Sequence, residues 1–224
     1  MDAVLLQRLA QITEEERELL QGRGVDRALY ASGRAFEVDA AKMLEKGKLM
    51  SIRPHTRFAP FPRHSHNYVE IMYMCLGKTV HRIDGDALVT LEAGELLFLN
   101  RHASHAIQRA DAGDIAVNFI VLPQFFDEAF NMAGMDNVLS RFLLGELYTG
   151  GAAVSYLHFR VREVLPVQNL VENMVWTLVN RQPGARRINQ VTMGLLLLQL
   201  MHYTECIDMS RNGSVRSPMV EAGP

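Results

Sequence analysis

The chain has 224 residues, of which 48% are hydrophobic and 21% are charged, proportions typical of a globular protein. Its 23 Lys and Arg residues against 25 Asp and Glu residues give a net charge of −2, so the chain lacks the basic surplus of a nucleic-acid-binding domain. The longest apolar run, residues 193–201, is too short to cross a bilayer, and the acidic N-terminus does not resemble a secretory signal. These features predict a cytoplasmic protein with no membrane partner.

Residues 1–46 are predicted to form an N-terminal helical segment. Thr13 and Glu16 have the spacing of a capping box at the start of the run EEERELLQ. Gly22 and Gly24 follow this run and provide a stop signal. A helix is therefore expected over about residues 14–21.

Residues 47–160 are predicted to form an antiparallel β-barrel. Six short runs with strand character lie between residues 49 and 122: LMSI, YVEIMYMC, TVHRI, ALVTL, ELLFL and IAVNFIVL. Asp84 and Gly85 form a two-residue hairpin signal between the third and fourth runs. No long helical pattern separates the runs, which favours a jelly roll or barrel over a parallel sheet. Two short helices and one late strand are expected between residues 125 and 159.

Residues 161–208 are predicted to form a helical pair, followed by a disordered tail over 209–224. The first helix carries apolar residues at helical spacing, namely Val167, Leu170, Val171, Met174, Val175 and Leu178. In the second, at about 187–207, the run from Leu195 to Leu198 places apolar side chains on every side of the axis. Such a helix lies in a core or faces another subunit, and a homodimer contact is favoured because a small barrel covers only one side.

Three polar residues in the run HSHNYVE have even spacing. If the chain is extended from His64 to Glu70, then His64, His66 and Glu70 project to one side, since side chains alternate along a strand. His105 follows another strand and a short turn, from where it could reach the same interior. Three imidazoles and a carboxylate suit Zn, Ni, Fe, Mn or Cu ions without selecting one of them.

Each of these residues also has a simpler interpretation. The four could be a polar cluster whose members hydrogen-bond to one another, to water or to a polar ligand. Tyr68, Met72 and Met74 share the spacing of Glu70 and are predicted to line an effector pocket with it, although such side chains usually fill small barrels. His55 and His81 are interpreted as surface or strand-face residues, and His102 as a replacement ligand if the register differs.

Two motifs resemble those of the cupin superfamily. The run HSHNYVEIMYMCLG is similar to the first cupin motif, through His64, His66, Glu70 and Gly77. The run at 94–109 is similar to the second motif in Gly94 and His105. It departs from that motif at three positions, which are Asn100, His102 and Arg109.

A broader resemblance covers residues 44–100, 114–127 and 170–179. These segments look like the effector-sensing and dimerisation region of AraC-type transcription regulators. The resemblance implies a cupin-like barrel that binds a small molecule, a helical pair that forms a homodimer, and a separate helix-turn-helix domain that binds DNA. Too few residues follow the second helix for that DNA-binding domain, so it is expected to be absent from this chain.

The predicted function is therefore that of the sensing and dimerising part of an AraC-type regulator, rather than an enzyme. The effector would be a sugar or another polar metabolite. No nucleophile elbow, P-loop or Rossmann fingerprint is present in the sequence. The alternative is a stand-alone cupin metalloenzyme, a dioxygenase or isomerase, with His64, His66, Glu70 and His105 as its metal ligands.

Overall fold

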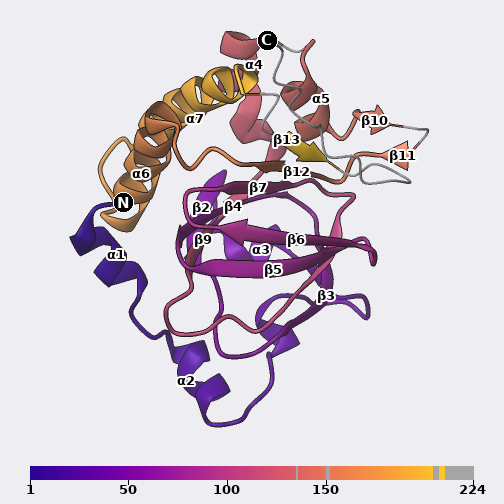
Figure 1. Cartoon of the computed structure of the whole chain (residues 1–224), viewed down its shortest axis with the longest axis vertical. Helices are drawn as coiled ribbons and strands as arrows, with labels where there is room; N and C mark the ends of the chain where they lie inside the picture. The colour runs from indigo at the N-terminus through magenta and orange to yellow at the C-terminus, as the bar shows by residue number, and fades with distance from the viewer. Residues whose placement is uncertain (135, 150–151, 204–206, 210–224) are drawn as a thin grey trace, which may run out of the picture.

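Two β-sheets face each other and form a barrel in the computed structural model, which describes residues 1–134, 136–149, 152–203 and 207–209 (Figure 1). The first sheet has the strand order β1 (Glu37–Val38), β3 (Phe61–His66), β8 (Ser104–Ile107), β5 (Lys78–Ile83) and β6 (Ala87–Glu92). The second has the order β13 (Ile207–Met209), β12 (Tyr156–Phe159), β7 (Leu96–Leu99), β4 (Val69–Leu76), β9 (Ile115–Val121) and β2 (Met50–Pro54). All of these neighbours are antiparallel except β1 and β3. The predicted cupin-like antiparallel barrel is confirmed, as are the six predicted strands.

The hairpin between β5 and β6 turns at the predicted residues. Asp84 and Gly85 both have positive φ, at 51° and 92°. A two-residue hairpin turn of the type that follows the strand twist requires positive φ at both central residues, which Asp and Gly tolerate best. The loop is one residue longer than predicted, because Asp84, Gly85 and Asp86 all lie between the paired residues Ile83 and Ala87.

Strand β4 is buried on both faces because it lies between the barrel interior and a helical layer. Met72 and Met74 point inward, whereas Ile71 and Tyr73 point toward the helices. The interior cluster takes side chains from both sheets: Met72, Met74, Ile83, Val89, Leu91, Leu97, Leu99, Ala103, Ala116 and Tyr156. The larger cluster lies between the second sheet and the helices.

The helical layer covers the outer face of the second sheet (Figure 1). It consists of η2 (Pro123–Phe126), α4 (Asp127–Ala133), α5 (Val138–Leu144), α6 (Leu165–Val179) and α7 (Ala185–Met201), with the small hairpin β10 (Tyr148–Thr149) and β11 (Ala152–Ala153) beside it. The second predicted helix was extended too far, because α7 ends at Met201 and residues 207–209 form a strand. The rest of the predicted disordered tail, 210–224, lies outside the described residues. No helix in the described ranges is long and apolar enough to span a bilayer.

The N-terminal segment runs along the barrel and reaches its mouth. It contains α1 (Ala3–Leu9), α2 (Glu14–Leu20), η1 (Arg27–Leu29), β1 and α3 (Ala40–Met43). The predicted capping box is present, since the Thr13 side chain accepts a hydrogen bond from the Glu16 N–H and the Glu16 carboxylate accepts one from the Thr13 N–H. Val38 of β1 pairs in register with His66 of β3.

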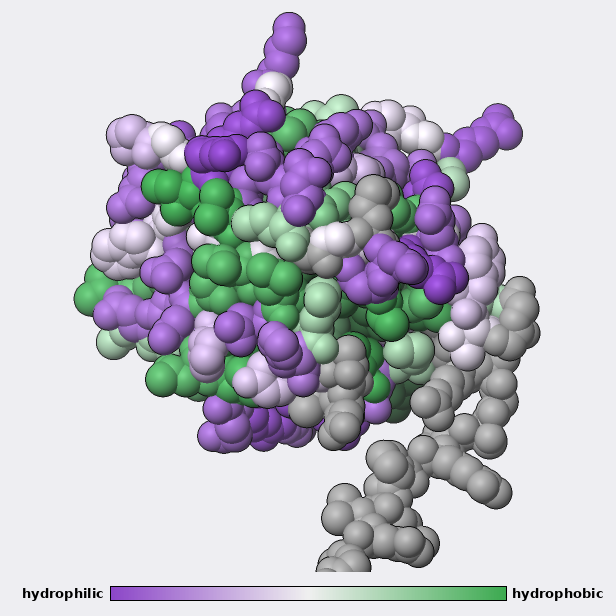
Figure 2. Space-filling view, turned by 90° about the horizontal axis from the view of Figure 1, so that it is seen from above, coloured by the Kyte–Doolittle hydropathy of each residue, from purple (hydrophilic) through white to green (hydrophobic). Residues whose placement is uncertain are grey.

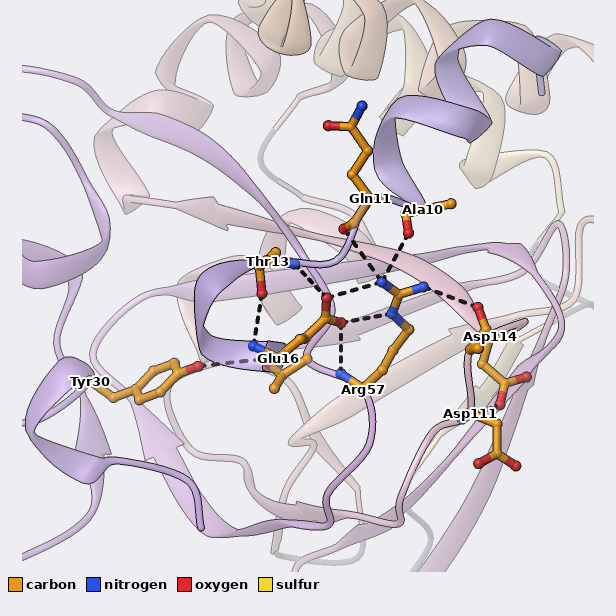
Figure 3. A network of polar contacts seen from close by, with 10 residues as sticks. Ala10, Gln11, Thr13, Glu16, Tyr30, Arg57, Asp111 and Asp114 are labelled. Atoms are coloured by element: carbon orange, nitrogen blue, oxygen red, sulfur yellow. Dashed lines mark hydrogen bonds and ion pairs between the residues drawn. The ribbon is translucent and has the colours of Figure 1, made fainter. Parts of the chain in front are cut away.

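A buried ion pair fastens this segment to the barrel (Figure 3). The Arg57 Nε atom lies 2.7 Å from Glu16 Oε1, and both side chains are almost completely buried. The same guanidinium donates to the backbone oxygens of Ala10, Gln11 and Ala112. Burial would raise the pKa of Glu16, but the hydrogen bonds and charge of Arg57 outweigh it and lower that pKa below its usual value. This arginine therefore links α1, α2 and the loop before β9.

Candidate metal and ligand site in the barrel

The structure brings together the four residues that the sequence singled out. His66 Nε2, His105 Nε2 and Glu70 Oε2 form a triangle with sides of 3.4, 3.4 and 3.5 Å. The ligand nitrogens of His64, His66 and His105 all lie within 4.8 Å of one another. All four side chains are buried.

Glu70 comes close to His64 and His66 in a different way from the one predicted from the sequence. The chain does not stay extended from His64 to Glu70: it bends at Asn67 and Tyr68, which carry it from β3 in the first sheet to β4 in the second. Glu70 therefore approaches the histidines from the opposite sheet. His105 reaches them through β8, where it pairs in register with His64.

The donor atoms fit a divalent transition metal. Two ligand atoms on a tetrahedral zinc ion, each at about 2.0–2.1 Å, are separated by about 3.4 Å, which matches the sides of the triangle. Glu70 Oε2 also has no hydrogen-bond partner among the described residues. A buried carboxylate oxygen in that state requires a proton, a water molecule or a cation.

A chain of hydrogen bonds directs the lone pair of His105 toward this triangle. The Thr79 hydroxyl lies 3.8 Å from the sulfur of Met74, which can only accept, so the hydroxyl donates there. In the tautomer in which this donation holds, His81 Nε2, 2.9 Å from the same hydroxyl oxygen, is the donor. His81 Nδ1 is left as an acceptor, 3.4 Å from His105 Nδ1, which therefore carries the hydrogen. His105 Nε2 is left unprotonated and faces His66 and Glu70, as a metal ligand requires.

Burial sets the charge states of the site. It lowers the pKa values of His55 and His64 to about 4 and those of His66, His81 and His105 well below 6.5, so all five rings are neutral near pH 7. Burial also raises the pKa of Glu70 to about 7, although the Asn118 hydrogen bond and the charge of Arg53 oppose the shift. Neutral imidazoles and a carboxyl group that readily loses its proton are suited to metal binding.

A cavity of about 40 Å³ adjoins these residues, and we call it the barrel-mouth pocket. Its walls include Arg53, His55, His64, His66, Tyr68 and Glu70 from the barrel and Tyr30, Val38 and Met43 from the N-terminal segment. The Tyr30 hydroxyl donates to Glu15 at 2.5 Å, and the Arg53 guanidinium lies 5.0 Å from the centre of the Tyr30 ring. The N-terminal segment therefore closes the pocket, which has room for only a few atoms.

The predicted pocket residues divide into two groups. Tyr68 lines the barrel-mouth pocket together with His64, His66 and Glu70. Met72 and Met74 are completely buried deeper in the barrel, in the interior apolar cluster. They point inward as expected, but they pack against other side chains and do not line the pocket wall.

The interpretation of His55 and His81 as surface or strand-face residues was wrong. Both are buried: His81 stacks on His105 with ring centres 5.6 Å apart, and His55 lines the pocket. Whether two residues on different strands have odd or even numbers does not predict whether they lie on the same face of the sheet, because the register between the strands decides this. The charged Lys78 and Arg82 on either side of His81 are the signal that could have shown His81 to point inward.

The remaining histidines lie apart from the site. His102 is exposed and is not a replacement ligand in this register. His158 is buried, and its Nε2 atom lies 2.9 Å from Glu95 Oε2. His202 is exposed at the end of α7.

The part of the chain that contains this site is similar to a known protein family. Residues 51–130 match the family model described as "AraC-like ligand binding domain". This segment is thus similar to an AraC-like ligand-binding domain over about a third of the chain. The matched segment includes most of β2 and all of β3 to β9, and thus all four candidate ligands.

One solved structure shares the fold of this chain, and two others match it more weakly. An apo variant of ToxT from Vibrio cholerae has 12% identity and a TM-score of 0.53, covering 75% of this chain and 62% of its own. ToxT with a bound unsaturated fatty acid has 11% identity and a TM-score of 0.44, with coverage of 69% and 55%. A cupin protein from Bacteroides fragilis has 28% identity and a TM-score of 0.28, with coverage of 33% and 64%. No curated protein sequence matches the chain.

Proposed function

We propose that this chain is the effector-sensing and dimerising part of an AraC-type transcription regulator, with the barrel-mouth pocket as its sensing site. The match of residues 51–130 to the ligand-binding family carries this proposal. The ring of polar side chains around the pocket supports it, because such groups orient a polar ligand. In this account DNA is contacted by a separate helix-turn-helix domain, and the protein acts in the cytoplasm as a regulator rather than as an enzyme.

The size of the pocket limits the effector. A volume of about 40 Å³ holds roughly a few water-sized groups, so a sugar would require the N-terminal segment to move. Binding of a sugar or similar metabolite should therefore displace Tyr30 from Glu15. Hydrogen exchange of residues 26–43 with and without a panel of sugars and short polar acids tests this: faster exchange with the effector is expected, and unchanged exchange with a bound effector would contradict it.

We further propose that His64, His66, Glu70 and His105 hold one divalent transition metal ion. When bound, an ion that accepts a fifth or sixth ligand beyond these four residues would offer a coordination position to an oxygen of the effector. Purification without chelator should yield about one ion per chain by elemental analysis, and His66→Ala should lose it. Exposed His202→Ala is the matched control. Metal content far below one per chain in the wild-type protein would remove the metal from the account while leaving the sensing proposal intact.

The dimer contact is assigned to the helical layer. Ile188, Val191 and Leu195 lie along one side of α7 with 39–46% of their surface exposed, and Trp176 of α6 is 43% exposed. Figure 2 shows hydrophobic side chains gathered in the open on one face of the molecule, and this view from above looks onto the helical side. An exposed apolar face of this kind is typical of a protein interface.

Sedimentation equilibrium tests this contact. The wild-type chain is expected to form a dimer at micromolar concentration, and Leu195→Glu should shift it to a monomer. Leu88→Glu is the matched control, because Leu88 is 59% exposed on β6 of the barrel. A wild-type monomer, or equal effects of the two substitutions, would refute the assignment.

The second candidate is a cupin metalloenzyme of the dioxygenase or isomerase class. The observation that favours it is the grouping of three buried imidazoles and one buried carboxylate, a donor set that suits a metal ion. A sensor releases its effector unchanged, whereas an enzyme converts it. Recovering the bound compound after incubation with metal-loaded protein and comparing its NMR spectrum with the starting material separates the two candidates.

A further inference from the structure

A second and larger cavity lies outside the barrel, where the turn between α6 and α7 packs against β2. We call it the helix groove, and its volume is about 400 Å³. Volumes of roughly 300–1,000 Å³ are usual for small-molecule sites. The groove shares no lining residue with the barrel-mouth pocket. Its lining residues include Lys48, Met50, Ile52, Phe125, Leu178, Arg181, Arg186 and Asn189.

The charges around the helix groove favour an anion. Lys48, Arg181 and Arg186 line it, and Glu45 is the one carboxylate among the lining residues. Glu45 already pairs with Lys48 at 2.7 Å. Neither Arg181 nor Arg186 has an ion-pair partner within the described residues. Two guanidinium groups are therefore available for a ligand.

The first turn of α7 adds to this positive potential. Gly184 caps the helix without a side-chain hydrogen bond, and no acidic residue follows in the first turn. Gly184, Ala185 and Arg186 all line the groove. The N–H groups at the start of a 17-residue helix carry a partial positive charge that attracts anions.

Asn189 provides an independent sign of a missing ligand. Its side chain lines the groove and only 1% of it is exposed, yet its Oδ1 atom has no hydrogen-bond partner among the described residues. A buried amide oxygen without a partner is destabilising, and a carboxylate, which only accepts, could relieve this only if the amide turned its N–H groups toward it. By turning over, the amide can present either its oxygen or its N–H groups to a ligand.

The remaining wall of the helix groove is apolar. Met50 and Phe125 are buried there, and Ile52 and Leu178 are partly buried. The combination of an apolar wall and a cationic end matches a molecule with one hydrophobic part and one negative group. A purely polar anion would leave the apolar wall in water.

We infer that the helix groove binds a small amphipathic carboxylate, with its charged end at Arg181, Arg186 and Asn189 and its apolar body against Met50, Phe125 and Leu178. This site is additional to the sensing site proposed above and does not depend on it. Because the groove joins β2 of the barrel to the α6–α7 turn, a ligand there contacts both parts at once.

Calorimetric titration of the whole chain with decanoate, below its micelle concentration, tests the inference. Saturable binding of one decanoate per chain is expected. 1-Decanol has the same body without the charge and acetate has the charge without the body, and each should bind at least about tenfold more weakly, since hydrogen bonds to charged groups and apolar burial both contribute. Equal binding of decanol and decanoate would overturn the carboxylate assignment.

Two substitutions locate the ligand. Arg186→Gln and Asn189→Leu should each weaken decanoate binding about tenfold, while Arg101→Gln, at an exposed arginine elsewhere, should leave it unchanged. Glu70→Gln should also leave it unchanged, because Glu70 lies in the barrel. Decanoate binding that is lost in Glu70→Gln and retained in Arg186→Gln would place the ligand in the barrel and overturn the inference. Absence of saturable binding to the wild-type chain would also overturn it.

Discussion

The barrel-mouth pocket and the helix groove differ in size, in how they are closed and in the charge of the residues around them. The pocket, at about 40 Å³, is closed by the N-terminal segment and surrounded by buried imidazoles that are neutral near pH 7. The groove, at about 400 Å³, is bounded by permanently charged guanidinium groups and an apolar wall. As proposed above, the first site would select a ligand by coordination geometry and proton state, whereas the second would select one by charge and shape. One small domain can therefore offer two sites whose ligands do not compete.

Loosening the N-terminal segment should open the barrel-mouth pocket and make it as accessible to solvent as the helix groove. Arg57→Met leaves the buried Glu16 carboxylate without its partner, which costs about 3–5 kcal/mol when a buried pair is broken from one side. Urea denaturation should show a loss of this size in the free energy of unfolding, and hydrogen exchange should show residues 26–43 opening.

Arg23→Met is the control for the substitution in the buried Arg57–Glu16 ion pair. It breaks the pair between Arg23 and Glu18, whose side chains are 65% and 52% exposed. Exposed pairs contribute about 0–1 kcal/mol. If the two arginine substitutions lowered the free energy of unfolding equally, the Arg57–Glu16 ion pair would not be what holds the N-terminal segment in place.

Removal of a metal ligand should affect the pocket alone. His105→Ala deletes one corner of the triangle, and we expect zinc affinity to fall by roughly a hundredfold or more, beyond the usual effect of an outer-shell change. Zinc titration by calorimetry measures this, with decanoate titration of the same variant as the internal control. A variant that binds zinc as well as the wild-type chain would show that the ion lies elsewhere.

His81 should have a smaller effect in the same direction. It does not belong to the triangle, but in the tautomer described above its hydrogen bond holds the hydrogen of His105 on Nδ1. His81→Phe keeps a ring of similar size and removes that bond, so zinc affinity should fall by about 10–100-fold. His81→Asn or His81→Gln, which retain an acceptor, should restore part of the affinity. Equal loss in the Phe and Gln variants would point to packing rather than to orientation of His105.

The sequence predicted the pocket far better than the groove. The spacing of His64, His66 and Glu70 follows a short motif, and local turn chemistry placed the β5–β6 hairpin correctly. Strands β3 and β8 escaped notice because β3 contains Pro62 and three basic side chains, and β8 has four residues with little apolar character. The walls of the groove come from segments around residues 45–52 and 177–189, which meet only through tertiary packing. No local pattern marks such a site.

The pH dependence of stability should be specific to the barrel. Burial lowers the pKa of His55 to about 4, so the unfolded chain binds a proton below pH 6.5 that the folded chain does not. The stability that neutral His55 provides is therefore complete above pH 6.5 and falls by about 1.4 kcal/mol per pH unit between pH 6.5 and pH 4. Urea denaturation between pH 5 and pH 8 should show a shallower slope for His55→Leu than for the wild-type chain. An unchanged slope, with exposed His202→Leu as control, would contradict this.

X-ray absorption at the zinc edge of the zinc-loaded chain tests the proposed four-ligand site in the barrel most directly, since it reports the atoms around the ion. The account predicts three imidazoles and one carboxylate oxygen, from His64, His66, His105 and Glu70, at about 2.0–2.2 Å. A spectrum with sulfur ligands, or with fewer than two imidazoles, would contradict it.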